Sequence, residues 1–389
     1  MRSGHIRQRS TGSWELRYNP GPHPMTGKRR VATTTVRGTK KDAEKELRRL
    51  LRAVDTGEHV DPTRMTVGQW LADWLHSTAG EVAPRTHETY SDLVNHYLIP
   101  ALGNVPIVKL TPHHLQGAYA RWATGGRRDG KPGGLSALTR RHLHRVLSTA
   151  LTRAVEQQVI ARNPCDAFKK RLPKVERRKM SAITAEQSAR LLGAIRDHRV
   201  YWPALIALAT GMRRGEILGL RWGHVDLDRG VVSVVESLEK TRAGLRFKPP
   251  KSGKGRAVAL PAFAIDELRR LKREQAQALL RIGIGQDRDT LVCARADGSA
   301  MLPTSLTHEF AKFADCAEGV PRIRFHDLRH SHAAQLLAAG VHPKVAQERL
   351  GHSTISMTLD LYSHVSDTMQ EDAAARLDTA FRAGITGRK

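Results

Sequence analysis

Four short segments in the second half of the chain concentrate arginine, histidine and tyrosine. They read TGMRRGEILGLRW at residues 210–222, HDLRH at 326–330, LGH at 350–352 and LYSH at 361–364. Breaking a phosphodiester without a metal requires a nucleophile such as a tyrosine hydroxyl, positive charge on the phosphoryl oxygens and an acid for the leaving oxygen. Two guanidiniums can bind those oxygens bidentately, which a lysine ammonium cannot do. The segments therefore hold the groups that metal-free phosphoryl transfer needs.

Each segment alone has an ordinary structural explanation. Tyr362 continues a helical stripe with Ile355 and Leu359, the pattern of a packed core. Arg213 alone would be read as a solvated surface charge, and the histidines of residues 326–332 as structural groups or metal ligands. No glutamate joins the histidines in an H-E-x-x-H arrangement, so a zinc site is not supported.

The order and spacing of the segments favour a functional explanation. The chain resembles the tyrosine recombinase (phage integrase) family, in which four such boxes follow one another. His326 and His352 are 26 residues apart, and Tyr362 follows His352 by 10 residues, intervals similar to those of the family. Four boxes in register are hard to explain as separate structural coincidences.

The resemblance implies roles for the residues in these boxes. Arg213 and Arg329 are expected to hold the phosphoryl oxygens, and Tyr362 to be the nucleophile. His326 is the expected general acid or base nearest the nucleophile, and His352 a hydrogen-bond donor to the phosphate.

Two supporting residues are also expected. Lys251 is the candidate general acid for the 5′ oxygen, although Lys248 and Lys254 lie in the same predicted hairpin, residues 245–260. Lys251 fits best by the resemblance, because the lysine of the family stands just before a short polar turn, as Lys251 does here. Glu216, one helical turn after the first arginine of the site, is expected to orient a site arginine or histidine.

A nucleotide-binding loop is not predicted. The segment GGRRDGK at residues 125–131 fits a G-x-x-x-x-G-K pattern, but Pro132 stands where a Mg²⁺-binding Ser or Thr would be needed, and a helix precedes it. A covalent phosphotyrosine conserves the energy of the cleaved bond, so the resemblance implies neither ATP, metal nor any other cofactor.

The net charge indicates that the protein binds nucleic acid. The 389 residues carry 64 Lys and Arg against 38 Asp and Glu, a net charge of +26. Residues 1–61, 62–175 and 176–389 carry +7, +9 and +10, so every part can contact a polyanion. An Arg-rich proteome is the alternative explanation for this charge.

The compartment follows from what the sequence lacks. The three cysteines, Cys165, Cys293 and Cys316, are far apart, which leaves little room for a disulfide framework or a thiolate zinc site and favours a reducing cytoplasm. No apolar run follows the N-terminus, and no apolar stretch is long enough to cross a bilayer. Neither secretion nor membrane insertion is expected.

The first two modules are predicted from their periodicity. Residues 13–18 and 28–36 read as strands around a turn cluster, and residues 41–54 as a helix. Thr66 and Gln69 then form a capping box ahead of a helical stripe. Three more helices are predicted around residues 90–98, 111–122 and 143–155.

The third module is predicted to be mixed. Its expected elements are a helix opened by the Thr184 and Gln187 capping box, a helix at 202–210, a strand at 230–235, the hairpin at 245–260, and helices from residue 326 to the end.

The fold class is therefore multidomain and mainly α with small β-sheets. We expect an N-terminal arm DNA-binding domain (small β-sheet plus helix) at residues 1–61 and a four-helix core-binding domain, SAM-like by resemblance, at 62–168. A basic linker at 169–179 should lead to a mixed α+β tyrosine recombinase catalytic domain with a C-terminal tail helix at 180–389.

Basic residues in the first module and the linker are the candidate DNA contacts. A β-ribbon can enter the major groove, where Arg and Lys read guanine edges; a sequence-neutral basic arm is the alternative. The candidates are Arg7, Arg9, Arg17, Lys28, Arg29, Arg30, Lys169, Lys170 and Arg171.

The tail carries its own pattern. Leu377, Phe381 and Ile385 recur every four residues on an otherwise polar helix, which suits docking into a neighbouring subunit's groove. Packing against its own domain is the alternative.

The resemblance implies an integrase that joins a phage or other mobile element to a bacterial chromosome. Its partners would be double-stranded DNA at attachment sites, three further copies in a tetramer, a host DNA-bending protein and an excisionase, with no membrane. A Xer-type recombinase that resolves chromosome or plasmid dimers is the near alternative. A non-catalytic DNA-binding regulator explains the charge but not the boxes, and a metal-dependent transposase would need a carboxylate triad.

Overall fold

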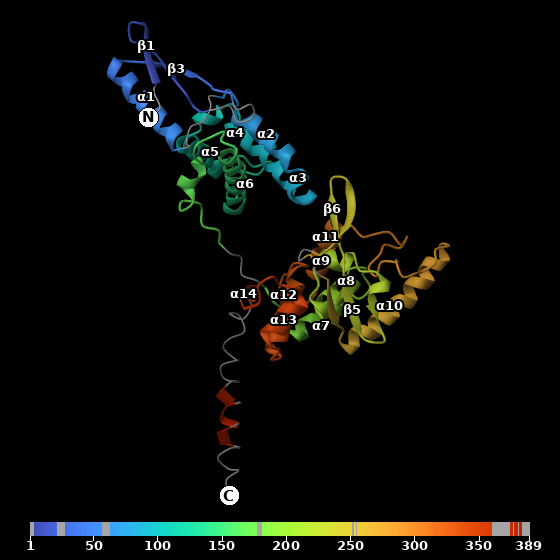
Figure 1. Cartoon of the computed structure of the whole chain (residues 1–389). Coiled ribbons are helices and arrows are strands. Elements are labelled where there is room, and N and C mark those ends of the chain that lie inside the picture. Colours follow the sequence, from blue (N-terminus) through green and yellow to red (C-terminus); the bar gives the residue numbers. More distant parts are fainter. Residues whose placement is uncertain are drawn as a thin grey trace. The chain divides into compact units, whose positions relative to one another are not determined.

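The computed structural model describes residues 4–21, 28–56, 63–176, 181–250, 253 and 255–359, with short pieces of the tail at 374–375, 377–379 and 381–382. The chain divides into two compact units, Met1–Glu176 and Arg177–Lys389. Figure 1 shows the small sheet and helical modules of the first unit and the mixed second unit. None of the helices in the described parts has the length and apolar character that crossing a bilayer requires.

The first module is a three-stranded antiparallel sheet with one helix. Its elements are β1 (Gly4–Ser10), β2 (Ser13–Tyr18), β3 (Ala32–Arg37) and α1 (Lys40–Asp55), and β2 is the middle strand. Thr39 and Asp42 form a capping box that starts α1. Leu16 packs with Ala43 and Leu47 in a small core between the sheet and the helix. β1 was not predicted, because Ile6 is the only large apolar residue in it.

The second module is helical and has a separate core. Its elements are α2 (Val67–Thr78), α3 (Pro84–Leu93), a π-helical turn (Val94–Leu98), α4 (Ile99–Leu102), α5 (Pro112–Thr124), α6 (Ala137–Glu156) and two 3₁₀ turns (Ile107–Lys109 and Pro164–Phe168). The predicted capping box of Thr66 and Gln69 is present. Trp70 anchors α2 to α6 by donating its indole N–H to the carbonyl of Ala150 at 2.9 Å.

The second unit surrounds two small sheets with helices. Its elements are α7 (Ala185–Ala194), α8 (Tyr201–Thr210), α9 (Arg214–Leu218), β4 (Val225–Asp226), β5 (Val231–Val234), β6 (Ser237–Thr241), β7 (Gly244–Lys248), β8 (Arg256–Ala259), α10 (Ala262–Arg281), α11 (Pro303–Ala314), α12 (Asp327–Ala338), α13 (Pro343–Leu350) and α14 (Ser356–Leu359). Its core centres on α8, of which nine of the ten residues are buried.

The predicted hairpin at residues 245–260 is wrong. β7 pairs with β6 and β8 pairs with β5, so the two strands belong to different sheets. β6 was missed because its sequence, SLEKT, is mostly polar. The segment between β7 and β8 therefore passes from one sheet to the other, and it includes Lys251, which lies outside the described residues.

The glycine-rich segment before α6 closes back on α5. Gly126 and Gly134 form an isolated antiparallel bridge, and the amide of Leu135 donates to the carbonyl of Trp122 at 2.8 Å. A Cβ at Gly134 would lie 2.0 Å from the carbonyl oxygen of Ala123, so only glycine allows this approach.

Candidate active site

Two helix C-termini form the floor of the candidate site. α8 is capped by Gly211 and α13 by Gly351, both with left-handed backbones (φ 68° and 63°). The last carbonyls of a helix have no partner within the helix and carry the negative end of its dipole, which favours cations there. A Cβ at Gly211 would lie 2.6 Å from the ring of His332, so the close packing at this terminus requires glycine.

Arg329 connects these two termini. It lies on α12 and donates from Nη1 to the carbonyl of Gly211 and from Nη2 to that of Leu350, the latter at 2.6 Å. The residue is 4% exposed. Burial, and then the nearby charge of Arg213, lower the pKa of Arg329 to about 9, so its guanidinium remains charged at neutral pH.

Arg213 lies beside Arg329 on the adjacent carbonyl. It precedes α9 and donates from Nη2 to the carbonyl of Gly351 at 2.9 Å and from Nη1 to Glu216 Oε1 at 2.9 Å. Its backbone amide donates to Glu216 Oε2 at 2.9 Å. Thus Glu216, predicted to orient a site arginine or histidine, contacts an arginine of the site.

Glu216 also binds a residue that the sequence analysis did not assign, Arg256 at the start of β8. Its Nη1 and Nη2 donate to the two Glu216 oxygens at 3.1 and 2.7 Å, and its Nε donates to the carbonyl of Arg349 at 2.9 Å. Burial raises the pKa of Glu216, but hydrogen bonds and charges from Arg256 and Arg213 outweigh it, leaving that pKa below its usual value. Glu216 is therefore an anionic link between Arg256 of β8 and Arg213.

The predicted histidines lie at the start of α12 and just after the end of α13. His326 stands at the start of α12, where its ring meets the His330 ring edge to face at 5.0 Å between centroids. His352 follows the end of α13. Burial, followed by neighbouring positive charge, lowers the pKa of His326 and of His352 to about 4. Both rings are therefore neutral at pH 7.

His332 has a structural role. Its Nδ1 donates to the carbonyl of Leu208 at 2.6 Å, and its Nε2 accepts from Arg349 Nε at 3.1 Å. These bonds tie α12 to both α8 and α13, the helices whose ends hold the arginines. Asp327 adds a further restraint by accepting from the Arg324 amide at 2.8 Å.

The remaining two predicted catalytic residues cannot be placed. Lys251 and Tyr362 lie outside the described residues. The structure thus brings together Arg213, Glu216 and Arg329 directly, with His352 next to the carbonyls that anchor them.

The predicted DNA contacts in the first module lie on its sheet and on the segment before β3. Arg7 and Arg9 lie on β1 and Arg17 on β2, all with exposed side chains. Lys28 and Arg29 are exposed and Arg30 is half-buried.

The linker candidates follow the last 3₁₀ turn of the helical module. Lys169, Lys170 and Arg171 are exposed there, and Lys169 pairs with Asp166 at 2.9 Å.

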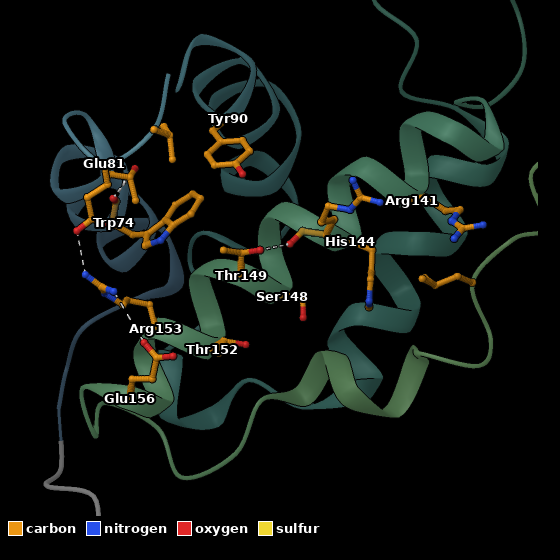
Figure 2. Close-up of a pocket in the computed structure, with 14 residues that line it drawn as sticks. Trp74, Glu81, Tyr90, Arg141, His144, Ser148, Thr149, Thr152, Arg153 and Glu156 are labelled. Carbon is orange, nitrogen blue, oxygen red and sulfur yellow. Dashed lines mark hydrogen bonds and ion pairs between the residues drawn. The ribbon is translucent and has the colours of Figure 1, made fainter. Parts of the chain in front are cut away.

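The helical module adds a hollow of about 530 Å³ beside α6, lined by both polar and apolar side chains. Figure 2 shows Ser148, Thr149 and Thr152 along one side, with the rings of Trp74 and Tyr90 on another. Hydroxyl groups of this kind suit contacts to a phosphate backbone.

A segment of each unit matches a known family model. Residues 181–369 match the phage integrase family, and residues 66–123 match the N-terminal SAM-like domain of phage integrases. The predicted multidomain, mainly α fold is confirmed by the helical modules and small sheets and by these matches.

Similar proteins extend over most of the chain. A protein of Caldanaerobacter subterraneus subsp. tengcongensis named tyrosine recombinase XerC-like is 26% identical over 362 residues, which cover 88% of this chain and 90% of the relative. The ICEBs1 integrase of Bacillus subtilis is 26% identical over 377 residues, covering 96% and 99%.

Solved structures share the fold. A Tn1549 transposon integrase in complex with a circular intermediate DNA has a TM-score of 0.66 at 23% identity, covering 80% of this chain and 99% of that one. A lambda integrase tetramer bound to a Holliday junction has a TM-score of 0.57 at 18% identity, covering 90% and 95%. From these matches and the four boxes, we conclude that the chain belongs to the phage integrase family of tyrosine recombinases.

Proposed function

We propose that this chain is a site-specific DNA recombinase that integrates and excises a phage or other mobile element. It cleaves and rejoins DNA strands through a 3′-phosphotyrosine formed by Tyr362. The observation that carries this proposal is the pair of guanidiniums of Arg213 and Arg329, held on the adjacent carbonyls of Gly351 and Leu350.

This arrangement suits a pentacoordinate phosphoryl group. An arginine has five N–H donors. Arg213 and Arg329 each use two side-chain N–H groups for the bonds described, and the other three have no protein partner among the described residues. Those donors can bind the non-bridging oxygens, where negative charge develops in the transition state.

The proton transfers fall to the neighbouring groups. The phenolic oxygen of Tyr362 attacks the phosphorus as its proton passes to a base, for which the neutral His326 is suited. The bond to the 5′ oxygen breaks, and Lys251 protonates that oxygen. His352 donates a hydrogen bond to the phosphate. Rejoining runs the same steps in reverse. Because the phosphotyrosine conserves the energy of each cleaved bond, no ATP is needed.

An integrase is favoured over a Xer-type recombinase, although one relative is named XerC-like. The chain carries a sheet-and-helix module before the helical one, with its own core. The ICEBs1 integrase matches over 96% of this chain, a span that includes most of that module.

Recombination between attachment-site DNAs should proceed in EDTA. The chemistry uses side chains for every charge and proton, so removing divalent cations should leave the rate of joined product unchanged within about twofold. The measurement is product formation on gels with EDTA and with Mg²⁺. Activity that vanished in EDTA and returned with Mg²⁺ would point instead to a metal-dependent transposase.

Lys251→Ala should lose cleavage of normal DNA but keep cleavage of DNA with sulfur at the 5′ bridging position. A thiolate leaves without a proton donor, so the sulfur substrate should restore the rate by about 10²-fold or more, the size of a general-acid contribution. Lys248→Ala is the matched control, because Lys248 pairs with Glu239 on β6. A sulfur substrate that failed to rescue Lys251→Ala would assign the acid to another residue.

We further propose that the first module binds DNA sites separate from the crossover site. Arg7, Arg9 and Arg17 lie on one sheet, whose strands can enter a major groove. A chain that begins at Pro62 should still cleave an isolated crossover site, because its helical core shares no residue with that of the first module. It should fail to assemble on full attachment-site DNA.

Footprints on full attachment-site DNA measure the difference. Full-length protein should protect sequences outside the crossover region, and the shortened chain should not. If full-length protein protected the crossover region alone, the first module would be only a sequence-neutral basic arm.

The working assembly is proposed to be a tetramer on double-stranded DNA in the bacterial cytoplasm. A lambda integrase tetramer bound to a Holliday junction shares the fold. In the described pieces of the tail, Leu377 is 60% and Phe381 67% exposed, which leaves them available for a neighbouring subunit. A host bending protein and an excisionase are proposed as further partners.

A further inference from the structure

The sheet of the first module has one covered and one uncovered face. Leu16 and Tyr18 on β2 pack with α1 residues in the core. Side chains alternate along a strand, so Glu15 and Arg17 point to the other face. Arg7 on β1 lies directly opposite Glu15 in the register and joins them there.

Glu15 occupies the centre of that uncovered face. It is the only acidic residue in the three strands. Although α1 lies on the opposite side, the Glu15 side chain is 1% exposed, whereas those of Arg9 and Arg17 are 62% and 51% exposed. The two arginines therefore lie over the carboxylate and remain open to solvent themselves.

Each carboxylate oxygen holds one of the arginines. Arg17 Nε donates to Glu15 Oε1 at 2.6 Å, and Arg9 donates from Nε and Nη2 to Glu15 Oε2. Arg9 reaches it from a β-bulge, because Gln8 pairs with Trp14 and Ser10 with Ser13, leaving Arg9 as an extra residue. Bulges commonly redirect a side chain in this way.

The bond to Arg17 leaves the guanine-reading groups of that arginine free. Arg17 is held through Nε, and within the described part of the chain its two Nη groups have no protein partner. Bidentate contact with O6 and N7 of guanine needs an arginine with fixed orientation. A flexible arginine would instead bind any nearby phosphate.

A central carboxylate also has an electrostatic cost for DNA binding. Hydrogen bonds from Arg17, and further ones from Arg9, hold the pKa of Glu15 below its ordinary value despite burial, so it is ionised at neutral pH. Its charge repels phosphates in a module whose sequence carries a net charge of +7 with Glu15 included. Sequence-neutral binding would be stronger without it.

We propose that Glu15 is a positioning residue that fixes Arg9 and Arg17 for reading base edges, so that it lowers general DNA affinity and raises sequence discrimination. This inference rests on the proposed function of the first module as a reader of sites outside the crossover region. It predicts opposite effects of one substitution on two DNAs.

The experiment uses the full chain with Glu15→Gln. One probe is the duplex that the unaltered chain protects outside the crossover region; the other has the same composition in shuffled order. Glu15→Gln should bind the shuffled duplex about threefold more tightly, since one negative charge is lost. The ratio of the two affinities should fall by about tenfold, because the arginines lose their orientation.

Two controls separate orientation from charge. Glu44→Gln removes the same charge from an exposed position on α1 and should leave the ratio unchanged. Arg17→Gln alone should lower the affinity ratio strongly. In a chain that already carries Glu15→Gln, adding Arg17→Gln should lower the ratio only weakly, whereas two independent charges would give additive effects.

The outcomes are distinguishable. A ratio unchanged by Glu15→Gln would overturn the inference and leave the module as a sequence reader. Weaker binding to both duplexes would also overturn it, since Glu15 would then be needed for folding. If the unaltered chain protects no duplex outside the crossover region, the proposed function of the module fails, and the inference with it.

Discussion

Tyr362→Phe should bind attachment-site DNA normally and form no covalent protein–DNA complex. Phenylalanine keeps the ring and loses only the oxygen that attacks the phosphorus. On a nicked substrate whose cleaved end diffuses away, the unaltered chain should accumulate the phosphotyrosine adduct. The rate of adduct formation by the variant should be lower by at least about 10³-fold. The adduct is measured on denaturing gels, and DNA binding by gel shift.

Tyr201→Phe is the matched control in the same unit. The Tyr201 hydroxyl donates to Glu267 Oε2 at 2.9 Å and its side chain is buried, so it cannot reach DNA. Its removal should cost about 1 kcal/mol of unfolding free energy and leave adduct formation intact. An adduct formed by Tyr362→Phe, located by mass spectrometry on another tyrosine, would reassign the nucleophile.

The site residues that belong to the four boxes could be predicted from the sequence. Arg213, Arg329 and Glu216 were identified from the boxes, and the structure places them in one cluster of hydrogen bonds. Arg256 and Arg349 were missed, because a basic residue at a strand start or in the last turn of a helix is common in a chain with 64 Lys and Arg. Only tertiary packing reveals that Arg256 is a partner of a buried carboxylate.

The fold was predicted best where local signals are strong. The capping boxes at Thr66 and Thr184 fix the starts of α2 and α7 as expected. Strand pairing was predicted poorly, because turn residues at 251–255 look like a hairpin whether or not the flanking strands pair. β7 and β8 follow one another in sequence, and their actual partners are β6 and β5.

Arg329→Lys should reduce cleavage by about 10²-fold or more. The remaining activity, relative to that of the unaltered chain, should rise as pH falls. Lysine cannot hold the carbonyls of Gly211 and Leu350 while also clamping a phosphoryl oxygen. The site lowers the pKa of the arginine to about 9, mainly through burial. The same environment should lower the pKa of a lysine at this position well below its ordinary value of ~10.4.

The sign of the pH effect follows from that lowered pKa. As pH falls, the introduced lysine gains its proton, so the rate of Arg329→Lys relative to the unaltered chain should rise between about pH 9 and about pH 6. The measurement is single-turnover cleavage of the nicked substrate by both proteins across this range. Thermal unfolding of the variant checks that the two helix ends still pack.

Arg213→Lys provides the contrast that decides the cause. The Arg213 side chain is 25% exposed and lies 2.9 Å from the Glu216 carboxylate, so a lysine there should keep its charge across the same range. Its cleavage rate should also fall by about 10²-fold, because bidentate contact is lost, but its ratio to the unaltered chain should not change with pH. If the Arg329→Lys ratio were equally flat, the loss at position 329 would come from geometry alone, and burial of that charge would have no part in catalysis.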